Sequence, residues 1–245
     1  MVLNWFKKKK SKEEIELECA NFRKKERELI WESLFLENLL DNIKFEECAY
    51  REPQQTEKKL FTYDKSLERI KKDGLERHAR PQEVFGVIIA GLEDKLDASL
   101  QKINEDMLKS YGEWLSCAFE RQGNKLFAYL DPEGLMWNQK QNKYVVQGEL
   151  KYAEKKEFDI TGINSTQWTD LNKFNEEFIK YMYGKKCSDL PAEIKEGSKK
   201  AQVYLPPDKT VCPVGRGNYV DGYVVYCCYY FRASRGVVVG AKKAA

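Results

Sequence analysis

The segment Lys125–Trp137, KLFAYLDPEGLMW, is where the chain changes from helical to strand-like patterning. Residues Lys125–Leu130 alternate in character with the two-residue period of a strand. The residues Asp131–Gly134 are typical of a turn, so we expect Leu135–Trp137 to return beside the first strand. A further strand is predicted to begin at Tyr144 and to extend through Leu150. This part of the chain therefore contributes a sheet.

Upstream of this segment, the apolar spacing predicts helices. A capping box formed by Ser11 and Glu14 begins one long helix that runs toward Cys48. Asp64 caps a short helix that ends at Gly74. Pro81 suits the first turn of a second long helix. The apolar face of that helix repeats every three or four residues and comprises Val84, Ile88, Leu92, Leu96, Leu100, Ile103, Met107, Tyr111, Leu115 and Phe119.

Downstream, the pattern predicts one more helix and several strands. Asp170–Tyr183 is amphipathic and is followed by Gly184, a usual helix stop. Three segments rich in β-branched and aromatic residues indicate strands, namely Val203–Leu205, Tyr219–Phe231 and Val237–Val239. We therefore expect an α+β protein with long N-terminal helices followed by a mixed helix-plus-sheet domain. The expected division is a helical region over residues 1–80 and an α+β domain over residues 81–245.

The composition describes a folded chain without a dominant charge. Of its 245 residues 42% are hydrophobic and 33% are charged, and the net charge is +3. Such a balance neither requires nor excludes a nucleic-acid partner. There is no secretory signal and no run of about 20 apolar residues, so a soluble protein is expected. The seven cysteines are scattered without zinc-site spacing, which indicates free thiols in a reducing cytoplasm.

The first long helix carries a heptad row of apolar residues. Residues at this spacing form a line that suits a partner helix lying alongside. The row predicts a protein–protein contact, either with another protein or with copies of this chain. Its members are Ile15, Phe22, Leu29, Leu36 and Ile43.

A lysine cluster precedes that helix. Lys7, Lys8, Lys9 and Lys10 follow Trp5 and Phe6, a combination that suits an anionic membrane surface. The same lysines suit contacts with a phosphate backbone. A solvated lead-in to the helix is the third interpretation, and the sequence does not separate the three.

Acidic residues and a lysine near the predicted strands suggest metal-dependent chemistry. Hydrolysis of phosphodiesters commonly uses carboxylates that hold a divalent cation, with a lysine near the attacking water. Asp131 and Glu133 lie in the predicted turn, and alternation places Glu149 and Lys151 on one face of a strand. The alternative is an ordinary turn followed by an exposed strand face.

The strings Pro132–Trp137 and Gly148–Lys151 together resemble the two halves of the PD-(D/E)XK nuclease motif. The resemblance covers residues 120–151 and implies a Mg²⁺-dependent nuclease acting on DNA or RNA. It implies that Glu133 (or Asp131) and Glu149 hold the metal and that Lys151 assists the nucleophile. It further implies an acid on a preceding helix, at Glu113 or Glu120, and a polar residue at Gln167. Without this resemblance, no metal or cofactor is expected.

Two other groups of residues give weaker indications. His78 is the only histidine and lies in a charged segment, so we expect it on the surface rather than in a catalytic site. The tyrosine-rich segment Tyr219–Phe231 favours a sheet core or a protein interface over base stacking. The leading functional hypothesis is therefore a non-catalytic interaction or assembly subunit that docks through its N-terminal helix. A nuclease and a peripheral membrane-surface protein are the alternatives.

Overall fold

The structure is a computed structural model that describes residues 45–46, 62–72, 77–96, 98, 101, 104–105, 113–164, 167–195, 201–217, 224–227 and 238–241. The chain divides into two compact units, Met1–Asp41 and Asn42–Ala245, and every described residue belongs to the second. The expected division into residues 1–80 and 81–245 stays a prediction. Tyr63 and Trp114 lie in one apolar cluster, so the segment 62–72 shares a core with the strand that contains Trp114.

The predicted helix that begins at Ser11 lies outside the described residues up to Ile43. It does not reach Cys48, because Phe45–Glu46 is a short strand, β1. Strand β1 pairs with β12 (Val238–Ala241), which also pairs with β2 (Arg77–His78). These three strands form a small sheet of their own.

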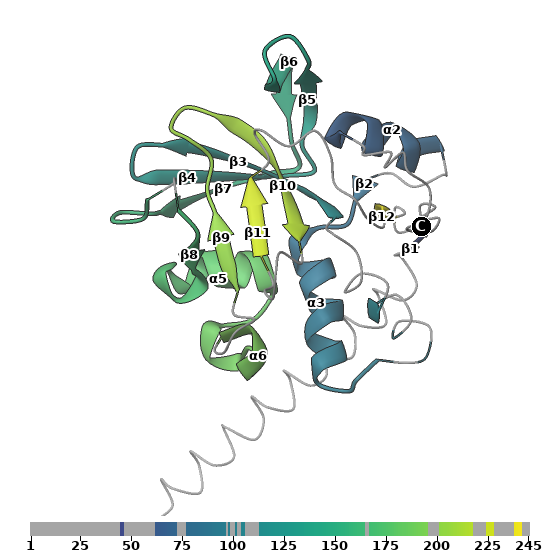
Figure 1. Cartoon of the computed structure of the whole chain (residues 1–245), viewed down its shortest axis with the longest axis vertical. Coiled ribbons are helices and arrows are strands. Elements are labelled where there is room, and N and C mark those ends of the chain that lie inside the picture. The colour runs from purple at the N-terminus through teal and green to yellow at the C-terminus, as the bar shows by residue number, and fades with distance from the viewer. Residues whose placement is uncertain are drawn as a thin grey trace, which may run out of the picture. The chain divides into compact units, whose positions relative to one another are not determined.

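Seven of the described strands form the main sheet in the order β7-β4-β3-β10-β11-β9-β8 (Figure 1). All neighbouring pairs are antiparallel except β11 and β9, which are parallel. The mixed α+β class is confirmed. The strands are β3 (Glu113–Gln122), β4 (Lys125–Leu130), β7 (Glu154–Asp159), β8 (Thr169–Asp170), β9 (Gln202–Tyr204), β10 (Val211–Gly217) and β11 (Val224–Cys227).

Strand β3 corrects the prediction of one long helix from Pro81 to Phe119. The helix α3 ends at Leu92, and Glu113–Gln122 is a strand in the middle of the sheet. Every residue from Trp114 to Phe119 is buried, because both faces of this strand are covered. A run that is apolar on both faces also satisfies the three-and-four spacing of a helix, so spacing alone misassigned it.

Helices cover one face of the sheet. Helix α3 (Pro81–Leu92) and helix α5 (Glu176–Tyr183) lie on the same side in Figure 1, and the rings of Phe85 and Tyr183 are 4.2 Å apart. Phe119 of β3 contacts Phe178 of α5 from the sheet side, at 5.9 Å between rings. The prediction for residues 170–183 is confirmed in its second half, where Gly184 ends α5 with φ of 73°. Short helices flank α5. The helix η1 (Leu171–Lys173) precedes it, and η2 (Cys187–Asp189) and α6 (Ala192–Lys195) follow it.

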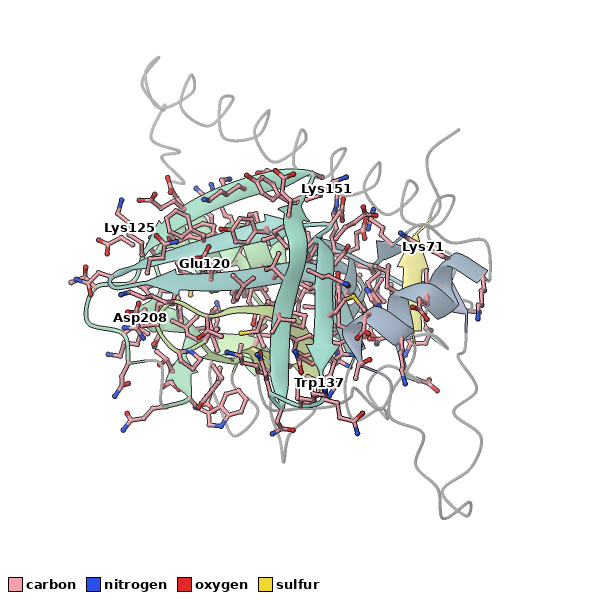
Figure 2. The ribbon with its side chains drawn as sticks, turned by 90° about the horizontal axis from the view of Figure 1, so that it is seen from above. Lys71, Glu120, Lys125, Trp137, Lys151 and Asp208 are labelled. Carbon is pink, nitrogen blue, oxygen red and sulfur yellow. The ribbon has the colours of Figure 1, made fainter. Side chains whose placement is uncertain are left out.

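A two-stranded ribbon, β5 (Glu133–Asn138) and β6 (Lys143–Lys151), lies over the other face (Figures 1 and 2). Its inner residues Leu135 and Tyr144 join an apolar cluster with Trp114 and Tyr129 of the sheet. Helix α2 (Tyr63–Lys72) lies beside β5, and the amide of Tyr63 donates a hydrogen bond to the Tyr144 hydroxyl at 2.9 Å. The short helix predicted after Asp64 is thereby confirmed.

The expected hairpin at Asp131–Gly134 is wrong. Strand β4 pairs with β3 and β7, whereas β5 pairs with β6. The turn therefore carries the chain out of the main sheet and into the ribbon. Turn-forming residues indicate a change of direction but do not select which strands pair afterwards.

Strand β10 was not predicted because Pro213, Gly215 and Gly217 interrupt its pattern. It nevertheless occupies the centre of the sheet, and its register with β3 shifts between Pro213 and Gly215. A local irregularity of this kind accommodates a proline that cannot donate to the ladder.

None of the helices that the structure describes has the length and apolar composition needed to span a lipid bilayer.

Candidate functional site

The described elements cover the sheet face that the ribbon crosses only in part, and we call the remaining part of this face the open face. Glu120 and Lys125 lie on one side of the ribbon, whereas Lys71 of α2 lies on the other (Figure 2). Strand β6 borders the open face, because α2 packs beside β5. Cross-strand pairing places Glu120 opposite Phe127 and opposite Val211, so these three side chains share this face. Phe127 and Val211 are half-buried.

A fixed polar pair sits in the open face. Tyr129 is 4% exposed and its hydroxyl donates a hydrogen bond to the Glu120 carboxylate. The Gln122 side-chain amide donates to the other oxygen of that carboxylate at 2.8 Å. Burial raises the pKa of Tyr129 well above its ordinary value, and the hydrogen bond and charge of Glu120 act in the same direction. Tyr129 therefore remains a neutral hydrogen-bond donor at physiological pH.

Lysines and aromatic rings lie together at the β7 side of this face. The ammonium of Lys155 lies 4.2 Å from the centre of the Phe127 ring and 5.3 Å from that of Tyr129. This geometry is a cation–π contact. Lys125 is paired with Glu157 at 2.7 Å, whereas Lys151 and Lys155 have no ion-pair partner among the described residues. These two exposed lysines are available to an anionic group of a partner.

Four large apolar side chains remain exposed among the described residues, Met136, Val146, Tyr152 and Trp168, by 38%, 36%, 45% and 42%. Met136 and Val146 belong to the ribbon, and Tyr152 follows β6 with its ring 5.0 Å from Tyr129. The ring of Trp168 lies 5.3 Å from Tyr204 of β9. Tyrosine, tryptophan and methionine are enriched in protein interfaces.

Asp131 and Glu133, predicted as metal ligands, are held by basic residues. Asp131 accepts two hydrogen bonds from Arg80, at 2.5 and 3.2 Å, and lies 3.7 Å from Arg77. The hydrogen bond and charge of Asp131 raise the pKa of Arg80, against the effect of burial. Glu133 pairs with Lys71 at 3.1 Å.

The other residues of the nuclease hypothesis are spread over the sheet and ribbon. Glu149 and Lys151 are exposed on β6, and Lys151 lies opposite Glu133 in the ribbon. Glu113 and Glu120 both lie on strand β3, with Glu113 at its start, and neither of them lies on a helix. Gln167 is exposed. Among the described residues no group of three or more His, Cys, Asp or Glu side chains lies close enough together to hold a metal ion. The nuclease hypothesis stays a prediction.

The expectation that His78 lies on the surface is wrong. Its side chain is fully buried, its Nε2 atom is 2.9 Å from the Ser66 hydroxyl, and its ring packs on Tyr63 at 4.8 Å. Burial lowers the pKa of His78 to about 3, so the ring is neutral. Since Ser66 is also buried, this pair is shut off from any substrate.

The remaining predicted sites lie outside the described residues. They are the heptad row Ile15, Phe22, Leu29, Leu36 and Ile43, and the lysines Lys7, Lys8, Lys9 and Lys10. Among the described cysteines, Cys117 and Cys212 are buried free thiols and Cys187 is a half-buried one.

Comparison with protein-family models, with curated proteins and with solved structures finds no match to this chain. No sequence pattern indicates the open face as a candidate site. Tyr129 and Glu120 are nine residues apart, and only the register of β3 and β4 brings them together.

Proposed function

We propose that the protein is a non-catalytic protein–protein interaction or assembly subunit. The observation that carries the proposal is the set of exposed apolar side chains. Met136 and Val146 lie on the ribbon, Tyr152 lies beside Tyr129, and Trp168 lies beside Tyr204 of β9. Aromatic side chains of this kind supply much of the energy of protein interfaces when they become buried. The predicted heptad row of the N-terminal helix is a second docking element in this proposal.

The charges near the ribbon support binding rather than hydrolysis. Asp131 and Glu133 are neutralised by Arg80 and Lys71, and Tyr129 holds Glu120 in a hydrogen bond. Carboxylates engaged in this way have fewer free lone pairs for a cation or for a water nucleophile. We place the protein in the cytoplasm within this proposal, because buried free thiols suit a reducing compartment.

The test is the mass of the full chain in solution, measured by light scattering over a wide range of concentration. The proposal in its self-assembly form expects a mass that rises above the monomer value of 28.7 kDa. If the heptad row is the docking element, the double variant Leu29→Glu and Leu36→Glu will reduce the assembly. If the exposed aromatic residues are the docking element, Trp168→Ala will reduce it. A constant monomer mass would overturn self-assembly, and the peptide experiment below then tests binding of another protein.

A further inference from the structure

We infer that the outer edge of strand β6 is a strand-addition site that takes an extended peptide segment of a partner protein. The inference deepens the proposed function and rests on it, because it names how the partner is bound and what chemistry the partner presents. In this binding mode, backbone hydrogen bonds supply affinity and alternate side chains supply specificity.

The first argument is the free edge. Strand β6 pairs with β5 on one side, and no other described strand pairs with it. Residues 145–149 make no backbone hydrogen bond to any described residue outside the ribbon. Lys143–Val146 pair with β5 in regular register, whereas Gln147–Leu150 form an irregular stretch in which Gly148 has φ of 78°. Lys143 and Val146 are exposed and Val145 is half-buried, so the outer backbone groups of this regular stretch are accessible to another strand. An added strand would pair with these groups.

The second argument is the contrast with the edges of the main sheet. Strand β7 carries four consecutive exposed charged residues, Glu154–Glu157, which disfavour pairing with another chain. Strand β8, at the opposite edge, has only two residues. The β6 segment Tyr144–Gly148 contains no charged residue and no proline, and its Tyr-Val-Val sequence favours extended structure. Among these edges, β6 has the longest stretch without a charged residue, and this stretch is bounded by Lys143 and Glu149.

The third argument is the surface beneath that edge. A strand added to β6 would lie over the open face and cross the sheet as the ribbon does (Figure 2). Phe127 and Val211 are half-buried there and already pack against the apolar cluster beneath the ribbon. The added strand would be the third of the ribbon layer, and its inward side chains would complete the burial of these two residues.

The charges specify the partner further. Lys151 and Lys155, both exposed and without ion pairs among the described residues, lie where β6 meets β7. Lys143 is exposed at the other end of β6. A complementary segment has apolar residues at alternate positions and an aspartate or glutamate at an end. The occupant is therefore an extended, alternating apolar peptide with acidic flanks.

The experiment selects binders without assuming a partner. A random library of twelve-residue peptides displayed on phage is panned against the full chain, and enriched peptides are synthesised. We expect sequences with alternating apolar residues and terminal acidic residues. Methylation of the backbone nitrogen at every second position should weaken binding by at least about tenfold, whereas methylation at the intervening positions should be tolerated. This two-residue period is specific to a bound strand.

Variants of the protein locate the site. Val146→Lys alters the edge and Val211→Lys places a charge beneath the added strand, and both should weaken the peptides by at least about tenfold. Asn172→Lys, at an exposed residue of η1, adds the same charge elsewhere and should leave binding unchanged. Circular dichroism and a thermal melt of each variant confirm that the fold is retained. If Val211→Lys is unfolded, Val211→Thr replaces it.

Three results would overturn the inference. Peptides whose binding is unaffected by both Val146→Lys and Val211→Lys bind elsewhere, so the strand-addition site is wrong while the interaction function stands. Peptides without the two-residue methylation pattern bind in another conformation, with the same consequence. If no peptide is enriched, the inference falls, and a constant monomer mass in the light-scattering experiment would then remove the proposed function as well.

Discussion

At the scale of single residues, burial decides what His78 can do. It is the only histidine of the chain, and in a charged sequence segment it resembles an exposed residue. The folded protein instead encloses it between Tyr63 and Ser66. Its ring is neutral because the charged form would lose its hydration without gaining a counter-charge. His78 is therefore part of the core and senses pH only through unfolding.

His78 makes stability fall in mild acid. Its pKa is lowered to about 3 in the folded protein, whereas the unfolded value is 6.5, so between these pH values only the unfolded chain takes up the proton. Above pH 6.5 the histidine is neutral in both states and does not lower the free energy of unfolding. As the pH falls from 6.5 toward 3, proton uptake by the unfolded chain lowers the free energy of unfolding progressively. Between pH 7 and pH 5 we expect the free energy of unfolding to fall by about 2 kcal/mol through this effect. Urea denaturation at both pH values, compared with His78→Asn, measures it.

A single histidine allows a direct check of the same prediction. Its ring protons give one set of NMR signals, which should not titrate between pH 7 and pH 5 while the protein is folded. A midpoint near 6.5 would show that the ring is accessible and would contradict the buried position.

Asp131 serves the fold in this structure, through its ion pairs with Arg80 and Arg77. Asp131→Asn removes the charge but suits the left-handed backbone there, where φ is 51°. We expect the free energy of unfolding to fall by about 1–2 kcal/mol, a moderate value because Arg80 is partly exposed to solvent. Glu149→Gln removes an exposed carboxylate that has no ion pair among the described residues, and should change it by less than about 0.5 kcal/mol. Equal losses in the two variants would contradict this role.

At the scale of elements, the ribbon depends on a close contact between its two strands. Gly134 has φ of 89°, and a Cβ atom there would lie 2.8 Å from the backbone oxygen of Glu149. The register between β5 and β6 shifts at this point, between Glu133 and Leu135. Both the left-handed backbone and the contact therefore exclude a side chain.

Two alanine substitutions separate backbone strain from steric clash in the ribbon. Gly148 has φ of 78° but nothing within 4 Å of a built Cβ atom, so Gly148→Ala meets strain alone and should cost about 1 kcal/mol. Gly134→Ala adds the clash with Glu149 and should cost at least about 2 kcal/mol. Urea denaturation gives the two values, and hydrogen exchange at Leu135 and Tyr144 should rise more in Gly134→Ala. The reverse order would contradict the ribbon geometry.

The elements that sequence periodicity predicts are those with one buried face. Helices α2 and α5 have this character, and their predictions are confirmed. Strand β6 is confirmed as well, although only Tyr144 of this strand is buried. Strand β3 is buried on both faces, and the spacing of its apolar residues predicts a helix instead. Strand β7 is missed for the opposite reason, since its residues are almost all charged and exposed. Periodicity carries no information where neither face or both faces are apolar.

The candidate site was less predictable than the fold, because it depends on contacts between distant residues. The partner of Asp131 is Arg80, and the register that joins Glu120 to Tyr129 is set by strand pairing. Tyr152 and Trp168 differ from buried aromatic residues only in the surroundings that the folded chain leaves around them. A sequence pattern therefore singles out the acidic residues but not the basic groups that neutralise them.

At the scale of the whole molecule, the charged edge strand β7 protects the main sheet from pairing with other molecules. Four successive residues of β7 are exposed and charged, namely Glu154, Lys155, Lys156 and Glu157. No described strand other than β4 pairs with β7. Desolvating these charges in a sheet-to-sheet contact costs free energy, so association through this edge is disfavoured. Charge thus disfavours pairing with another strand at the β7 edge, whereas the stretch Tyr144–Gly148 of β6 carries no charge that would do so.

Removal of that charge tests the difference between the two edges. The double variant Glu154→Val and Lys156→Val leaves the net charge at +3, so a change in colloidal repulsion does not explain its behaviour. We expect it to form sheet-rich aggregates on gentle heating, because β7 then presents apolar β-branched residues along an open edge. Turbidity and thioflavin fluorescence follow the process. The control Lys173→Val with Glu177→Val removes an exposed pair of opposite charges away from any strand edge and should stay clear. Aggregation of both variants alike would mean that exposed valines, and not an unprotected strand edge, cause the association.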